Sequence, residues 1–210
     1  MKICTLCPRM CAVDRKSGER GICGQTTEIK VARAALHFWE EPCISGEMGS
    51  GAVFFSGCAL HCVFCQNENI ANGTAGKVIS TERLGEIFLE LQEKGANNIN
   101  LVTPGQFVPQ IIKAVELARN QNLKIPIVYN TSSYESYFSL HSFHTPSIAI
   151  ITMELYEIFE NASTSNSLIV KFRNKTLLRR LPLLDKTIFN PYIDCKINNL
   201  IIFPIRDLTV

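Results

Sequence analysis

Residues 51–67 read G-A-V-F-F-S-G-C-A-L-H-C-V-F-C-Q-N, a short apolar run followed at once by three cysteines. The apolar run at 52–55 is bounded by glycines and predicts a buried β-strand. The cysteines, Cys58, Cys62 and Cys65, have the spacing C-x3-C-x2-C. Three thiolates this close together, with no fourth in the loop, can hold three irons of a cubane iron–sulfur cluster and leave the fourth iron open. Because an electron-transfer cluster normally has four cysteine ligands, this loop predicts chemistry at the open iron.

Two helices and two further strands are predicted after this loop. The first helix should run from Ser80, as its N-cap, to Gly95, and the second should begin near Pro109. The runs 98–103 and 125–131 have the composition of buried strands. Strands and helices that alternate in short units predict an α/β fold with parallel strands and crossover helices. The cysteine loop then lies at the carboxyl end of the first strand, where parallel sheets and barrels place their active sites.

A second group of cysteines lies near the N-terminus with the spacing C-x2-C-x3-C-x11-C, and consists of Cys4, Cys7, Cys11 and Cys23. Four thiolates suffice for a tetrahedral zinc ion or for a fully ligated auxiliary cluster, and the spacing does not choose between them. Unligated thiols are the third interpretation. For the three-cysteine loop, the alternative is structural zinc with His61 or a distant cysteine as the fourth ligand.

Composition and charge narrow the class of protein. The chain has 210 residues, of which 46% are hydrophobic and 19% charged, which fits one sizeable folded domain with a small appendage. A net charge of +2 is too small to imply nucleic acid or an anionic membrane as a partner. The N-terminus lacks the apolar segment of a signal peptide, and no apolar stretch can span a bilayer. We therefore expect a cytoplasmic protein whose clustered cysteines bind metal.

The chain after residue 135 differs from the part before it. All twelve glycines lie at or before Gly105, and helix caps and turn residues are nearly absent from the tail. Isolated strand-like runs occur at 148–151, 168–170 and 200–203. Three parts are expected: a cysteine-rich metal-binding segment at 1–24, a core at 25–135, and an atypical tail at 136–210. We hypothesise that the tail is not the native continuation, through a frameshift or an error in the gene model.

Several motifs together resemble the radical S-adenosylmethionine superfamily, and within it the pyruvate formate-lyase activating enzyme-like group. They are the cysteine loop with the aromatic Phe64 before its last cysteine, C-T-L-C-P-R-M-C, G-E-R-G-I-C-G and N-L-V-T-P. The resemblance covers about residues 1–135. It implies a partial parallel (β/α) barrel of the radical SAM type, incomplete because the tail has no counterpart of the later strands. It also implies a 4Fe-4S cluster and S-adenosylmethionine as cofactors.

The implied reaction is reductive cleavage of S-adenosylmethionine to a 5′-deoxyadenosyl radical that abstracts hydrogen, with activation of a glycyl-radical enzyme as one outcome. Cys58, Cys62 and Cys65 would ligate the cluster, and Phe64 would lie by the adenine. The methionine part would be held by Thr103, Pro104, Gly105 and Gln106, and contacted by Asn130 and Thr131. This turn departs from the family pattern, because Gln106 is uncharged and the first two positions are not glycine.

The resemblance implies partners as well, namely an electron donor such as flavodoxin or ferredoxin and a protein substrate. No side chain is assigned a catalytic role. Two alternatives stay open at this point. One is a zinc-binding interaction module that uses both cysteine groups, and the other is a truncated, inactive fragment of such an enzyme.

Overall fold

The computed structural model describes residues 3–40, 42–63, 65–132 and 134–136, together with three strands of the tail at 148–152, 167–171 and 200–203. For the tail strands and residues 42–43 only the backbone is described. In chain order the elements are η1 (Arg15–Ser17), β1 (Ile29–His37), α1 (Pro42–Ser45), β2 (Ser50–Phe55), α2 (Glu68–Ala71), β3 (Lys77–Ile79), α3 (Thr81–Glu93), β4 (Ile99–Val102), η2 (Gly105–Phe107), α4 (Val108–Asn120), β5 (Ile127–Thr131), β6 (Ile148–Thr152), β7 (Ser167–Lys171) and β8 (Leu200–Phe203). The η elements are single turns of 3-10 helix.

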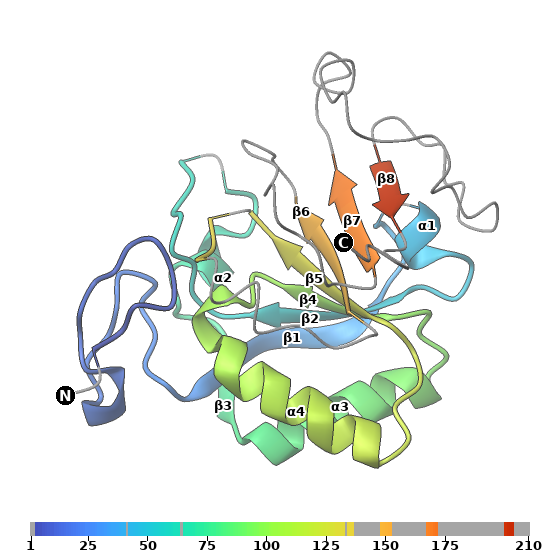
Figure 1. Cartoon of the computed structure of the whole chain (residues 1–210), viewed down its shortest axis with the longest axis horizontal. Coiled ribbons are helices and arrows are strands. Elements are labelled where there is room, and N and C mark those ends of the chain that lie inside the picture. The colour runs from blue at the N-terminus through green and yellow to red at the C-terminus, as the bar shows by residue number, and fades with distance from the viewer. Residues whose placement is uncertain are drawn as a thin grey trace, which may run out of the picture.

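The strands form one sheet in the order β3-β1-β2-β4-β5-β6-β7-β8 (Figure 1). The neighbours from β2 through β4, β5 and β6 to β7 are parallel, whereas β1 pairs antiparallel with both β2 and β3. At the other end β8 pairs antiparallel with β7. Within the described residues the sheet is open, with β3 and β8 as its edges. The fold is therefore mixed α/β, as the alternation of elements predicts.

The main core lies between one face of the sheet and the two long helices, α3 and α4, which lie side by side below it in Figure 1. Alternate residues of the central strands point to this face, because successive side chains of a strand point to opposite sides. The fully buried members include Val53, Phe55, Leu84, Phe88, Ile99, Leu101, Ile111 and Tyr129. Burial of each such side chain stabilises the fold by roughly 2 kcal/mol. Among the described helices, none combines the length and apolar character needed to cross a membrane.

The sequence located the central elements within a few residues. The strands at 52–55, 98–103 and 125–131 are confirmed as β2, β4 and β5, and the two helices as α3 and α4. Ser80 is the N-cap of α3, where its Oγ accepts a hydrogen bond from the Arg83 amide at 3.1 Å. Two strands were not predicted. In β1, several alanines weaken the alternation of apolar and polar residues that marks a strand. β3 has only three residues, too few to show a period.

The tail continues the sheet. Its three strand-like runs correspond to β6, β7 and β8, and the first two extend the parallel order from β5. The rest of residues 137–210 lies outside the described residues. Whether the tail is the native continuation, and where the three parts divide, stay predictions.

Ser80→Ala should lower the free energy of unfolding by about 1 kcal/mol, because the Arg83 amide at the start of α3 loses its acceptor. Ser80→Asp should retain most of the stability, since aspartate caps equally well and its charge suits a helix N-terminus. Urea unfolding followed by circular dichroism measures both variants. Equal losses in the two variants would show that the cap contributes nothing.

Candidate functional site

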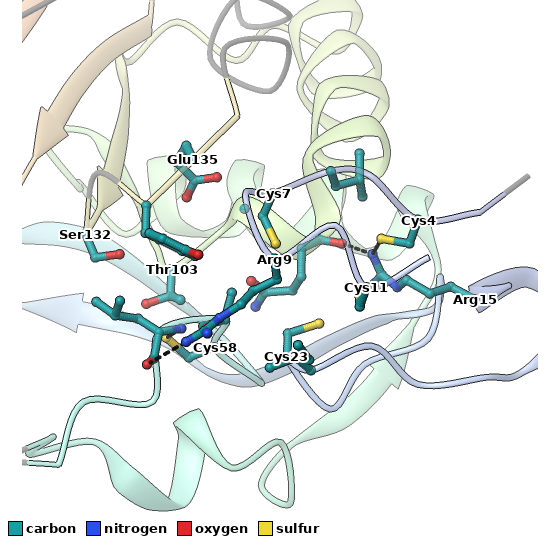
Figure 2. A pocket seen from close by; sticks show the side chains of 17 residues that line it. Cys4, Cys7, Arg9, Cys11, Arg15, Cys23, Cys58, Thr103, Ser132 and Glu135 are labelled. Atoms are coloured by element: carbon teal, nitrogen blue, oxygen red, sulfur yellow. Dashed lines mark hydrogen bonds between the residues drawn. The ribbon is translucent and has the colours of Figure 1, made fainter. Parts of the chain in front are cut away.

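A pocket at the carboxyl edge of the parallel strands gathers residues from four parts of the chain (Figure 2). Cys58 follows β2, Thr103 and Gln106 follow β4, and Glu135 follows β5. The N-terminal segment supplies its four cysteines with Arg9 and Arg15. Parallel strands end at the same edge of a sheet, so the loops that follow them meet there. The sequence predicted this meeting for the cysteine loop and the turn after β4.

The cysteine loop begins directly after β2, and Cys58, Cys62 and Cys65 are each partly buried. The Leu60 amide donates a hydrogen bond to Cys58 Sγ at 3.4 Å. The Cys65 amide donates to the Cys62 carbonyl at 3.1 Å, which closes a turn between the last two cysteines. His61 has a positive φ of 51°, so the loop bends sharply just before Cys62. Phe64 lies outside the described residues.

The Gln106 side chain holds the start of this loop. It is buried, and its Nε2 donates to the carbonyls of Ser56 at 3.0 Å and Gly57 at 2.9 Å. Its amide group thus joins the turn after β4 to the residues that precede Cys58. The neighbouring Thr103 has a positive φ of 55°, and its amide donates to the Asn130 carbonyl at 3.0 Å. The turn is therefore fixed by backbone contacts to β5.

The N-terminal segment holds the same loop from the other side. Arg9 Nε donates to the Ala59 carbonyl at 2.9 Å, and His61 Nε2 donates to the Ile22 carbonyl at 2.9 Å. Gly57, with a φ of +86°, lies so close to the Cys23 carbonyl that a Cβ atom there would clash with it. Both the backbone conformation and the close approach require glycine at this position.

The four N-terminal cysteines are thiols and line one side of the pocket, with Arg9 between them and Cys58 in the view of Figure 2. Cys23 is buried and the other three are partly buried. Burial raises the pKa of the Cys7 thiol and of the Cys23 thiol. A buried thiol is a weak ligand until a metal displaces its proton, so metal binding here releases protons.

Glu135 is a pocket residue that the sequence interpretation did not single out. Its Oε1 accepts a hydrogen bond from Thr131 Oγ1 at 2.8 Å, and its carboxyl group lies against the Cα of Gly105 and beside the Tyr129 hydroxyl. The residue as a whole is partly exposed, but its Oε2 atom is buried. Burial raises the pKa of Glu135 to about 7. A charged residue four positions after a parallel strand was the available signal, because such residues lie at the active edge of the sheet.

The remaining predicted residues divide into two sets. Thr103, Gly105 and Gln106 line the pocket. Pro104, Asn130 and Thr131 are buried beside it, at the ends of β4 and β5. Contact of any of these residues with S-adenosylmethionine stays a prediction.

The donor set of the cysteine loop fits an iron–sulfur cluster. Three partly buried cysteines lie on one loop, and a backbone amide already points at the Cys58 sulfur, which is the kind of hydrogen bond that tunes thiolate ligands of iron. Among the described residues, no three cysteine, histidine or carboxylate side chains converge closely enough to hold a single metal ion. Binding therefore requires the cysteine side chains to turn toward the bound group.

Comparison with known proteins agrees with this donor set. A family model for a 4Fe-4S single cluster domain matches residues 44–175, more than half of the chain, and includes the three-cysteine loop. The chain belongs to this 4Fe-4S single cluster domain family. An iron–sulfur domain is thus established, while the match leaves out the N-terminal cysteines.

One curated relative is an uncharacterised protein of Methanocaldococcus jannaschii, 28% identical over 147 residues. The alignment covers 67% of this chain and 41% of the relative, so the chain spans about two fifths of that protein's length. No solved structure matches the chain significantly.

Gln106→Met should lower the free energy of unfolding by about 2 kcal/mol, because the buried carbonyls of Ser56 and Gly57 lose their donor. The matched control is Gln121→Met, at an exposed position after α4, which should change stability by less than about 0.5 kcal/mol. Urea unfolding of the metal-free protein measures both. If the two variants unfold at the same urea concentration, Gln106 does not hold the loop.

Glu135 should make stability depend on pH. Its pKa of about 7 in the folded state lies above the usual value of 4.5, so between these values the folded state keeps a proton that the unfolded state has lost. Stability is therefore greatest below about pH 4.5 and falls as the pH rises toward 7, by roughly 2–3 kcal/mol for this group.

Glu135→Gln should remove this dependence, so that the variant matches the metal-free wild type at pH 5 and exceeds its stability at pH 8. Urea unfolding at the two pH values tests this. Glu116→Gln, on the exposed face of α4, serves as the control and should keep the wild-type slope. A Glu135→Gln variant with the same slope would contradict the raised pKa.

Proposed function

We propose that this protein is a radical S-adenosylmethionine enzyme and that its sheet is part of a (β/α) barrel of that type. The observation that carries the proposal is the three-cysteine loop at the carboxyl end of β2, within a 4Fe-4S single cluster domain. The loop itself offers three cysteines, whereas a closed electron-transfer cluster needs four ligands. The resemblance of the surrounding motifs to the pyruvate formate-lyase activating enzyme-like group supports the finer assignment.

When bound, a 4Fe-4S cluster held by three cysteines supplies one electron and one iron with an open coordination position. In the proposed reaction, one electron enters S-adenosylmethionine and its sulfonium C–S bond breaks, giving methionine and the 5′-deoxyadenosyl radical. The radical then takes a hydrogen atom from the substrate. The electron comes from outside the chain, and we expect flavodoxin or ferredoxin to supply it. A glycine of a partner protein is the proposed substrate.

Two side chains of this protein restrain the conformation of the cysteine loop. Gln106 fixes its first residues, and Arg9 binds the carbonyls of Ala59 at 2.9 Å and Leu60 at 3.5 Å. These contacts reduce the conformational freedom that the loop loses when it binds a cluster.

The test is anaerobic reconstitution with iron and sulfide, followed by dithionite and S-adenosylmethionine. Wild-type protein should release methionine and 5′-deoxyadenosine, measured by liquid chromatography. Cys62→Ala should lose the brown absorbance and at least 100-fold of the 5′-deoxyadenosine, on the order expected when a cluster ligand is lost. Cys43→Ala, which changes a cysteine outside both groups, should retain the product.

Two results would contradict the proposal. Zinc without sulfide at the loop would favour the zinc-binding interaction module. A fully loaded cluster that gives no 5′-deoxyadenosine would favour the inactive fragment.

A further inference from the structure

Arg15 is a buried cation in the N-terminal cysteine segment, with 4% of its surface exposed. Its guanidinium donates to three backbone carbonyls: those of Gln25 at 3.1 Å, Gln106 at 2.9 Å and Thr26. It also lies 5.8 Å from the centre of the Phe107 ring. Among the described residues, no carboxylate lies within ion-pair distance of it. Arginine remains charged in proteins, and a buried charge is costly unless an opposite charge compensates it.

The remaining partner of Arg15 is a sulfur atom. Its Nη1 lies 3.9 Å from Cys4 Sγ (Figure 2). A neutral thiol does little to compensate a buried cation, whereas a metal-bound thiolate does. Four thiolates carry four negative charges and a zinc ion carries two positive ones, so a zinc tetrathiolate centre has a net charge of −2. Such a centre would compensate the buried positive charge of Arg15. The geometry of Arg15 thus indicates an anionic centre among these cysteines.

The backbone of the segment places the four cysteines on one side of the pocket. No three of their side chains converge in this structure, so binding requires them to turn toward a shared metal. The Cys4 amide donates to the Val13 carbonyl at 2.9 Å, and the Met10 amide donates to the Cys7 carbonyl at 3.0 Å, which folds residues 4–13 back on themselves. Gly21 completes the arrangement. A Cβ atom at this position would lie 3.0 Å from Cys11 Sγ and 3.6 Å from Cys23 Sγ, so glycine leaves the space in which the two sulfurs approach.

We propose that Cys4, Cys7, Cys11 and Cys23 form a second, tetrathiolate metal site, and that Arg15 is the positioning residue that compensates its charge. The site lies outside residues 44–175, so the single-cluster family domain does not account for it. Its ligand chemistry suits either a zinc ion or an iron–sulfur cluster, since both take four thiolates. The inference goes beyond the proposed function and does not depend on cleavage of S-adenosylmethionine.

The site also has a connection to the cysteine loop. Arg15 donates to the Gln106 carbonyl, and the Gln106 side chain donates to the carbonyls of Ser56 and Gly57, the two residues before Cys58. A metal that fixes the N-terminal cysteines therefore fixes Arg15 and, through Gln106, the start of the loop. Metal binding at the second site would therefore stabilise the conformation of the cysteine loop.

The test uses the full chain with Cys58, Cys62 and Cys65 all changed to alanine, so that the first site is absent. This variant is expressed with zinc and iron both supplied, purified without oxygen, and analysed for zinc, iron and acid-labile sulfide. Retention of about one zinc ion per chain without sulfide, or of about four irons with four sulfides, supports the site and identifies its occupant. A folded variant, by circular dichroism, that holds neither in stoichiometric amount overturns the proposal.

The role of Arg15 is tested on the same three-alanine background. Arg15→Met removes the charge but keeps the bulk, and should speed transfer of the metal to a competing chelator by about 10–100-fold. Arg15→Lys keeps the charge and should restore slow transfer, at least in part. If the methionine and lysine variants release metal at equal rates, Arg15 does not act through its charge.

Discussion

Two side chains hold together the three segments that meet at the carboxyl edge of the sheet. Gln106 donates to the carbonyls of Ser56 and Gly57, and Arg15 donates to the Gln106 carbonyl from the N-terminal segment. Both side chains are buried. Loss of the Gln106 side chain would leave the buried carbonyls of Ser56 and Gly57 without this donor, and loss of the Arg15 side chain would do the same to the Gln106 carbonyl. The arrangement of the pocket depends on this chain of donors, because the segments that carry Arg15 and Gln106 contain only single turns of 3-10 helix at these residues.

The parallel sheet explains why these segments are neighbours in the first place. In β2, β4 and β5 the chain runs in one direction, and α3 and α4 return it across a single face. The loops with Cys58, Gln106 and Glu135 therefore emerge at one edge. The antiparallel β1 arrives at that sheet from the opposite direction, which brings the N-terminal segment to the same edge just before β1 begins. The directions of the strands thus bring both groups of cysteines to the same edge of the sheet.

The features that could be predicted from the sequence are those set by residues close together along the chain. The helices and the central strands were predicted because caps such as Ser80 and runs such as 98–103 are recognisable within a short window. The cysteine loop was predicted for the same reason, since its spacing is local. The roles of Arg15 and Gln106 were not, because these residues are 91 positions apart and nothing near either one specifies the other. Glu135 was missed because its neighbours Gly105 and Tyr129 come from two different strand ends.

The contacts of the cysteine loop show that its structural unit is larger than the family domain. The family domain begins at residue 44, yet two residues before it hold the cysteine loop. Arg9 donates a hydrogen bond to the Ala59 carbonyl, and the Ile22 carbonyl accepts one from the His61 ring. Gly57 is in contact with the Cys23 carbonyl from the same segment. A domain cut at residue 44 would therefore retain Cys58, Cys62 and Cys65 but lose these contacts from the N-terminal segment. Since ordering a loop costs roughly 1 kcal/mol or more for each residue fixed, the N-terminal segment belongs physically to the cluster site.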